Sequence, residues 1–362
     1  MTRGTVFIVL VLGAVLLLVR LQDLVFQVLV AVIMACSIDP VVAKLMKIPR
    51  DRGWRWQPGR GPVVVATFVV ISVLVALVAL VIVSRLITDL SEFQQRLPQY
   101  SETLQQAAAA QAQELSLPAQ LIAGAIAQLQ RGLTDLTTII DTLLQIFGSI
   151  LNVVFTVIIA IYLAADSDRL LAFSARLFPS GDQAEGEAVL SMTGMRLGMW
   201  VRGQLVVATI ISALFWVGLT LIGVPYATLL SMIAFISEFI PLIGPFISSI
   251  PAIFVAFAAT TPGQGVATAL FCLVVEQLEN DYIVPRVMST ATTVHPLAVL
   301  LGILAGAQLF GAIGALLAVP IITCVTVIWA SIRAYRAGKL HPAQLETPAE
   351  LRAHPQSTHQ LR

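Results

Sequence analysis

The sequence predicts an all-α, polytopic integral membrane protein with about eight hydrophobic segments, two of them re-entrant helical hairpins. Composition is the first reason: of 362 residues, 58% are apolar and only 11% are charged. Ordinary globular chains have about 45–50% and about 25%. The second reason is that the apolar residues gather in long uncharged runs, two of which are much longer than one membrane crossing.

A bilayer core about 30 Å thick takes roughly 20 helical residues to cross. The eight segments are residues 4–19, 24–38, 63–83, 143–165, 203–222, 225–260, 265–284 and 297–332. The first two are short, and only RLQD separates them, so they are expected to form a tight helical hairpin. No small-residue cleavage site follows segment 4–19, which favours an uncleaved first span over a signal peptide.

These segments divide the chain into five parts. The first part contains an N-terminal helical hairpin and a basic cytoplasmic loop. The second contains two transmembrane helices that flank an extracytoplasmic amphipathic segment, 86–141. A cytoplasmic helical connector, a transport core and a polar, disordered cytoplasmic tail complete the chain. In this order the five parts are residues 1–61, 62–165, 166–202, 203–333 and 334–362.

Charge sets the orientation. The loop over residues 44–60 carries six lysines and arginines against one acid, whereas residues 86–141 are rich in acids. By the positive-inside rule the first loop is cytoplasmic and the second segment lies outside, and both termini are cytoplasmic. Apolar residues at helical spacing in the outer segment predict amphipathic helices that lie on the membrane or on neighbouring subunits.

Several classes of chemistry are absent from the sequence. It contains no phosphate-binding G-x-x-x-x-G-K-[ST] loop, no H-E-x-x-H metal motif and no G-x-S-x-G elbow. We therefore expect no enzyme, no catalytic residue, no cofactor and no metal site. The net charge of +1 gives no basic footprint for nucleic acid. The three cysteines lie far apart in apolar stretches and are expected to be small apolar fillers.

The stretch FISEFIPLIGPFISSIP interrupts an apolar run with Glu238, Pro241, Gly244, Pro245 and Pro251. A carboxylate at the centre of a lone helix costs about 2.5–3.5 kcal/mol on insertion scales. Broken backbone is tolerated in a membrane only where it is buried in protein or lines a watery cavity. The stretch therefore predicts part of a solute or ion path. The alternative is a kinked structural helix whose glutamate reaches the interface.

A second polar stretch is VVEQLENDYIVPRVM. Glu276, Glu279 and Asn280 fall at i, i+3 and i+4, which places them on one face of a helix. This face is a candidate lining of the path, with Arg286 beyond it and one carboxylate that titrates. The alternative is an interfacial cluster that pairs with Arg286 or Arg202.

Two segments, 225–260 and 297–332, are each 36 residues long. As straight helices they would extend about 54 Å, well beyond the hydrocarbon core. Their midpoints fall at the glycine-containing sequences PLIGP and FGAIG, so we predict that each folds back on itself. The first hairpin would enter from outside and the second from inside, the arrangement of inverted repeats. The rival is eight straight spans, which would place Arg286 outside instead of in the cytoplasm.

These motifs also carry a resemblance. EFIPLIGPFISSIPA, and EQLENDYIVPRVM followed by HPLAVLLGILAGAQLFGAIGALLAVP, resemble the two signatures of the autoinducer-2 exporter family of bacterial inner-membrane proteins. IYLAADSDR, RGQL and GVPYA are weaker similarities. The residues at the family's characteristic positions are Pro241, Gly244, Pro245, Glu279, Pro285, Pro296, Gly311, Gly314 and Pro320. The resemblance implies export of small solutes and assembly as homo-oligomers, specifically pentamers. It also implies sodium–proton exchange in some members.

The main hypothesis is a secondary exporter of a small polar, autoinducer-2-like solute across the inner membrane. A sodium or lithium/proton antiporter is the alternative, and a non-transporting membrane scaffold is the second alternative. The partners expected are the lipid bilayer, the solute, a proton or sodium, and further copies of the chain. Gly311 and Gly314 complete the candidate path, and Pro251, Pro285, Pro296 and Pro320 are expected to act as structural breaks.

Overall fold

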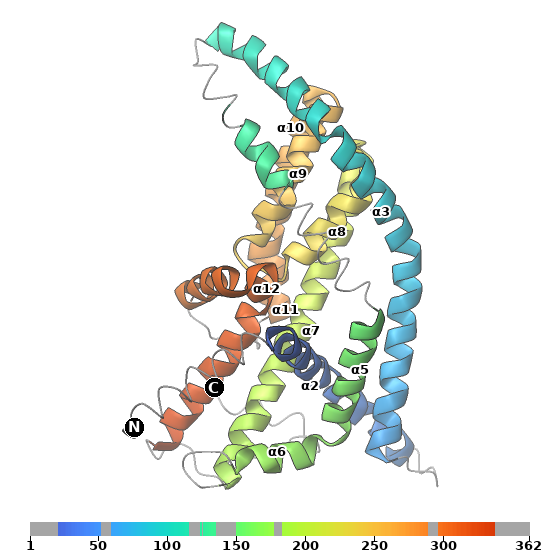
Figure 1. Ribbon diagram of the computed structural model, residues 1–362, viewed down its shortest axis with the longest axis vertical. Coiled ribbons are helices and arrows are strands. Elements are labelled where there is room, and N and C mark those ends of the chain that lie inside the picture. Colours follow the sequence, from blue (N-terminus) through green and yellow to red (C-terminus); the bar gives the residue numbers. More distant parts are fainter. Residues whose placement is uncertain are drawn as a thin grey trace, which may run out of the picture. The chain divides into compact units, whose positions relative to one another are not determined.

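The protein is helical throughout the part that the structure describes. The computed structural model describes residues 21–51, 59–115, 124, 126–134, 150–176, 183–288 and 296–336. The predicted segment 4–19 and the tail beyond residue 336 lie outside these ranges. The helices of Figure 1 are α2 (Gln22–Asp51), α3 (Arg60–Leu115), α5 (Ile150–Ala165), α6 (Ser167–Ala175), α7 (Gln183–Ile222), α8 (Ala227–Ser237), α9 (Gly244–Ala259), α10 (Pro262–Leu278), the π-helix η1 (Glu279–Ile283), α11 (Val284–Met288) and α12 (Pro296–Arg336). The all-α prediction is confirmed for the described residues.

Three helices are long and apolar enough to cross a membrane, judged by length and composition. They are α2 over Leu24–Ile48, α3 over Arg60–Val78 and α7 over Gly186–Ile222. Five shorter apolar helices accompany them: Asn152–Ala165, Ala227–Ser237, Gly244–Ala259, Leu297–Gly311 and Ile313–Trp329. Large apolar side chains stay exposed along α3, among them Val70 and Leu80 at 67% and 73%. Such exposure suits contact with lipid and is typical of an integral membrane protein.

The chain forms two compact units. Unit 1 comprises residues 1–71, 147–198 and 326–362, and unit 2 comprises 72–146 and 199–325. In unit 1, α2 packs against α5 through small residues that include Ala31, Ala35 and Ala160. Small residues let membrane helices approach closely. The approach of α7 to α2 in this unit is closer still, because a Cβ at Gly198 would lie 2.3 Å from the carbonyl oxygen of Cys36.

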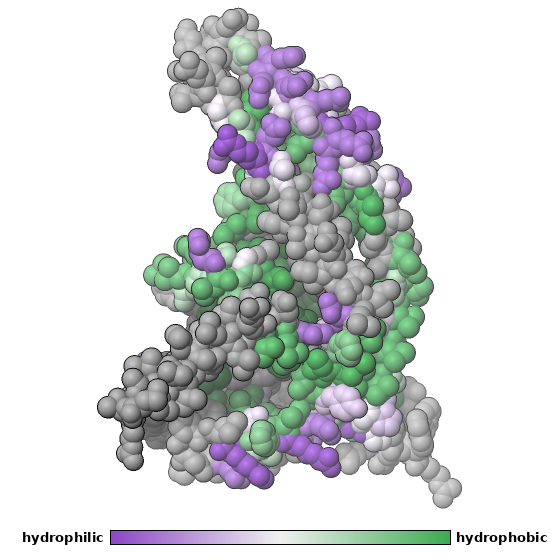
Figure 2. Space-filling view, viewed as in Figure 1, coloured by the Kyte–Doolittle hydropathy of each residue, from purple (hydrophilic) through white to green (hydrophobic). Residues whose placement is uncertain are grey.

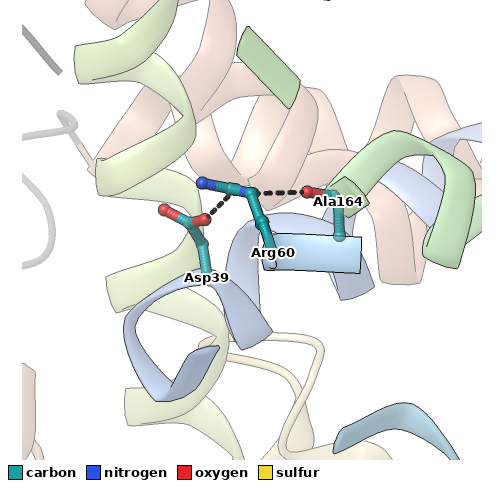
Figure 3. A network of polar contacts seen from close by, with 3 residues as sticks. All are labelled: Asp39, Arg60 and Ala164. Atoms are coloured by element: carbon teal, nitrogen blue, oxygen red, sulfur yellow. Dashed lines mark hydrogen bonds and ion pairs between the residues drawn. The ribbon is translucent and has the colours of Figure 1, made fainter. Parts of the chain in front are cut away.

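A polar clamp also holds unit 1 together (Figure 3). The Arg60 guanidinium pairs with the Asp39 carboxylate of α2 at 2.5 Å and donates to the carbonyl oxygen of Ala164 at 3.0 Å. Ala164 lies in the last turn of α5, where carbonyl groups lack helical donors. One arginine side chain at the start of α3 therefore ties α2, α3 and α5 to one another.

In unit 2, helices α8 and α9 form an antiparallel hairpin. Helix α7 ends at Gly223, whose φ of +87° is a left-handed backbone conformation that does not continue a helix. Glycine adopts this conformation at little cost. The Gln264 side chain donates to the carbonyl oxygen of Ile222 at 2.7 Å, and it also completes a capping box with Thr261 at the start of α10. The start of α10 thus meets the end of α7. The two helices also pack against each other along their length, so they run from this shared open end to a turn at residues 238–243.

The last apolar run, α12, folds back at Gly311. This residue has φ +63° and ψ −149°, a backbone conformation that is essentially restricted to glycine. A Cβ at Gly306 would lie 2.3 Å from the carbonyl oxygen of Gly314, and one at Gly302 would lie 2.1 Å from the Ile322 side chain. Residues on either side of Gly311 therefore meet in antiparallel order. The break falls within the predicted FGAIG sequence, three residues before its predicted midpoint.

The later part of α3 continues the same helix out of the apolar span, as the change from hydrophobic to hydrophilic colour along α3 in Figure 2 illustrates. Its apolar face packs into the core of unit 2, which contains Leu86, Leu90, Phe93, Leu97 and Tyr100 from α3. The face that the sequence assigned to the membrane or to neighbouring subunits is thus covered by the chain itself. Tyr100 and Tyr226 share a hydrogen bond at 3.2 Å between their hydroxyl groups.

Candidate transport site at the hairpin turn

The turn between α8 and α9 is fixed by its proline and glycine residues. Pro241 has no amide hydrogen and cannot continue α8, whereas Pro245 is suited to the first turn of α9. A Cβ at Gly244 would lie 2.4 Å from the carbonyl oxygen of Ser237, so only glycine fits this contact. Between them Leu242 has φ +70°, an unfavourable backbone conformation for a leucine. The turn, residues 238–243, is therefore tight and locally strained.

Glu238 is the first residue of this turn and is only 4% exposed. The side chain of Gln204, on α7, donates to the main-chain oxygen of Glu238 at 2.6 Å. The Oε1 atom of Glu238 is buried and has no hydrogen-bond partner among the described residues. A buried acceptor without a donor is costly, which indicates that this oxygen has a hydrogen-bond donor or a bound ligand in the working protein.

Glu279 faces this carboxyl group from the other side. Glu279 is 8% exposed and begins the π-helix η1, which connects α10 to α11. Pro285 lacks the amide hydrogen that a regular helix would need at this point, and a π-turn is one way in which a membrane helix adjusts to a proline. Such turns are frequent at functional sites. The side chains of Glu238 and Glu279 line the same small cavity, so their carboxyl groups are close enough for their charges to interact.

Among the described residues, no ion pair joins a basic side chain to this acid pair. The described residues contain two ion pairs, Asp39–Arg60 and Glu92–Arg96, and neither involves Glu238, Glu276 or Glu279. The alternative interpretation, an interfacial cluster that pairs with Arg286 or Arg202, receives no support from these two ion pairs. Two carboxylates that were both ionised would repel each other strongly where water is scarce. A proton or a cation between them would remove this repulsion.

A small cavity adjoins the acid pair. Its volume is about 10 Å³, close to the minimum for one water molecule. Besides the two acids, the lining includes Glu276, Ser248 and Ser249, with Cys272 among the apolar groups. Solute pockets are commonly about 300–1,000 Å³. The site in this state can hold a proton, a water molecule or a bare ion, but no organic solute.

The second hairpin lies against the turn of the first. Ile240 and Ile243 of the turn pack on Ile303, Ala315 and Ala318 of α12. The turn is consequently held by an apolar surface on α12, by Gln204 on α7 and by the acid pair.

The candidate residues named from the sequence separate into two groups. The structure brings together Glu238, Pro245, Glu276 and Glu279 around the cavity. Pro241 and Gly244 shape the turn, Pro251 is buried within α9, and Gly311 and Gly314 shape the second break. Asn280 and Arg286 are exposed, since the π-turn ends the simple helical face that was expected for Glu276, Glu279 and Asn280. Pro320 is buried in α12, which begins at Pro296.

Sequence reasoning did not single out Gln204, Ser248 or Ser249 as site residues. Gln204 was visible only as part of RGQL, a short motif whose contact to Glu238 depends on the tertiary fold. Ser248 lies one turn after Gly244 in α9 and donates to the Pro245 carbonyl at 3.0 Å. Its position on the cavity side of α9 follows from the antiparallel packing of the hairpin, which helical spacing alone does not define.

Apolar helices broken at proline and glycine, with buried acids at a break, are features found in membrane transporters. The comparisons with known proteins agree with this class. Residues 5–337 match the model of the AI-2E family transporter, and the chain therefore belongs to that family.

Three relatives illustrate the similarity. The chain is 26% identical to YueF of Bacillus subtilis over 198 residues, which cover 54% of this chain and 53% of YueF. It is 34% identical to MT0215 of Mycobacterium tuberculosis over 179 residues, or 49% of this chain and 48% of that protein. It is 26% identical to YhhT of Escherichia coli K12 over 317 residues, or 85% and 84%. All three are described as candidate transport proteins. The match thus spans about half the length of the first two and most of YhhT.

Proposed function

We propose that the protein is a secondary exporter of a small polar solute across the bacterial inner membrane, with autoinducer-2-like molecules as the first class to test. One observation carries this proposal: the turn of the first hairpin packs on the second hairpin, and it holds a buried acid, Glu238, whose Oε1 atom has no partner among the described residues. Broken helices of this kind place free backbone groups around a solute in secondary transporters. The family's description as transporters adds independent support.

In the proposed topology, both termini are cytoplasmic and the α8–α9 hairpin enters from outside. Residues 262–288 then cross inward, and the α12 hairpin enters from the cytoplasm. Arg286 is exposed and distinguishes this arrangement from eight straight spans. An Arg286→Cys variant lacking Cys36, Cys272 and Cys324 should resist an impermeant maleimide in intact cells and react in opened cells. Labelling of intact cells would reject the re-entrant arrangement.

The transport activity is tested in liposomes. Liposomes that contain the purified protein should release preloaded polar solutes, including the precursor diol of autoinducer-2, faster than protein-free liposomes do. Glu279→Gln should slow this release because it changes the acid pair. Asp281→Asn, two residues away and exposed, is the matched control and should leave release unchanged. Absence of release over a broad panel of solutes would overturn the proposal and favour the scaffold alternative.

The acid pair gives the antiporter alternative its own support, since carboxylates bind both small cations and protons. A pH-sensitive dye inside the liposomes separates the two functions. Addition of sodium or lithium should leave the dye signal unchanged for an exporter of a neutral solute and change it for an antiporter. We also propose a homo-oligomer, a pentamer by family resemblance, which native mass spectrometry of the purified protein can test.

A further inference from the structure

The cavity beside the acid pair is too small for any organic solute, so a transport path through this region needs a part that moves. The turn 238–243 is the candidate because its backbone is strained at Leu242 and because one of the contacts that hold it is the acid pair. Leu242 has the strained φ of +70°, and its side chain is 54% exposed. The turn therefore gains no packing of the Leu242 side chain in exchange for the strain.

We propose that the turn 238–243 is a gate, and that one proton shared between Glu238 and Glu279 holds it closed. This inference builds on the proposed transport function, since a gate presupposes a solute path. The ligand is a single proton. It binds between two carboxyl oxygens, one on the turn and one on η1.

The groups around Glu238 favour a proton over a fixed counter-charge. The titratable groups that face the site are Glu279 on η1 and Glu276 and Cys272 on α10. From α7 comes the neutral amide of Gln204, and from α9 come the hydroxyl groups of Ser248 and Ser249. The surface of α12 that contacts the turn is apolar. Within the described residues, no group facing the site supplies a positive charge.

With one proton, Glu238 and Glu279 form a hydrogen bond between a carboxyl group and a carboxylate, which is among the stronger hydrogen bonds in proteins. The buried Oε1 atom of Glu238 then borders a cavity with room for one water molecule. Without the proton, both groups are anionic, buried and adjacent, and they repel each other. Loss of one proton thus turns an attractive contact into a repulsive one.

This change acts directly on the backbone of the turn. Glu238 follows the last residue of α8, and the turn is closed by short hydrogen bonds from the amide groups of Phe239, Ile240 and Gly244. The bond from Ile240 to the Ser237 carbonyl is 2.9 Å and that from Gly244 to the Ile240 carbonyl is 2.8 Å. Of the contacts that restrain the turn, only that of the acid pair changes sign with pH. Release of the pair leaves the strained Leu242 free to relax.

Hydrogen–deuterium exchange of the full-length protein in lipid nanodiscs tests the gate without any transport measurement. The readout is the protection of the amides of Phe239, Ile240 and Gly244 between pH 5.5 and pH 9, corrected for intrinsic exchange. Peptides from α2 serve as an internal reference. A gate closed by one proton predicts that, above the titration midpoint, protection falls about tenfold per pH unit. Protection that is independent of pH over this range would overturn the proposal.

Two substitutions sharpen the test. Glu238→Gln and Glu279→Gln each replace one carboxyl group by an amide that donates to the remaining carboxylate, so the turn should stay protected at every pH. Asp281→Asn is the matched control and should keep the pH dependence of the unmodified protein. If Glu279→Gln retains that dependence, the proton is not shared with Glu279 and the proposal is wrong.

A final arm distinguishes the proton from a metal cation. Sodium or lithium is added at pH 9, where the gate is expected to be open. Protection should stay low, because the closing ligand is a proton. If sodium restores protection as acid does, the occupant is a metal cation and the proposal is overturned. A pH-dependent turn in a protein that moves no solute would refute the proposed function while leaving the gate in place.

Discussion

Replacing Gly244 by alanine should weaken the protein at one defined contact. The new Cβ would lie 2.4 Å from the carbonyl oxygen of Ser237 and 3.4 Å from the Cα of Glu238. Ordinary contacts are about 3.4 Å or longer, so the start of α9 must move away from the end of α8 by about 1 Å. Inserting a methyl group into such a packed place costs about 1–3 kcal/mol. Alanine returns up to about 1 kcal/mol through its higher helix propensity.

The net expectation for Gly244→Ala is a loss of about 1–2 kcal/mol in the free energy of unfolding. The measurement is denaturant-induced unfolding in detergent micelles, followed by circular dichroism. Gly263→Ala is the matched control, because Gly263 lies in the first turn of α10 and its nearest neighbour would be 4.0 Å from the new Cβ. The control should be at least as stable as the unmodified protein. Equal stability of the two variants would refute the close packing described for the turn.

Three further predictions concern other parts of the chain. Arg60→Met should cost about 2–3 kcal/mol of unfolding free energy, because it removes charge-assisted bonds to Asp39 and to the Ala164 carbonyl. A loss below about 0.5 kcal/mol in denaturant unfolding, as is typical of an exposed ion pair, would contradict this role. Gly311→Ala should cost about 1–3 kcal/mol in the same assay through backbone strain alone, since open space surrounds its Cβ, and an unchanged midpoint would argue against the fold at this residue. Burial raises the pKa of Asp89 above its usual value, so ionisation of this carboxyl group destabilises the folded state as pH rises. Asp89→Asn should therefore raise the melting temperature at pH 7 and flatten its change between pH 4 and pH 7. A lower melting temperature of the variant at pH 7 would contradict this reasoning.

The broken helices could be predicted from the sequence because length and residue type point to the same places. A run of 36 apolar residues is too long for one crossing, and proline and glycine near its midpoint supply the break. Pro241 and Gly244 thus located the first turn correctly. In the second run, the predicted midpoint was Gly314–Ala315, whereas the break lies three residues earlier, at Gly311. Gly314 is needed instead for close contact with Gly306.

The composition of the candidate site was harder to predict. Glu238 and Glu279 were each recognisable as acids in apolar surroundings, but their direct contact depends on how the hairpin packs on α10 and η1. Helical spacing predicted that Asn280 would share a face with Glu279. The π-turn inserts an irregular step at that residue, and no local propensity in the sequence announces it. Gln204 belongs to a regular helix, so only the tertiary fold shows that it binds the turn.

The length of α7 between Ile222 and Gln204 has an electrical consequence. Ile222 marks the open end of the first hairpin, and Gln204 marks the level of the acid pair. Along the helix these residues are about 27 Å apart, close to the full thickness of a hydrocarbon core of about 30 Å. With α7 upright in a bilayer, a proton arriving from the open end crosses about nine tenths of the membrane voltage, worth about 2 kcal/mol per 100 mV. A proton arriving from the other face crosses about one tenth. For the shared proton proposed above, membrane potential would therefore alter occupancy strongly from one side, while from the other side occupancy would follow the local pH.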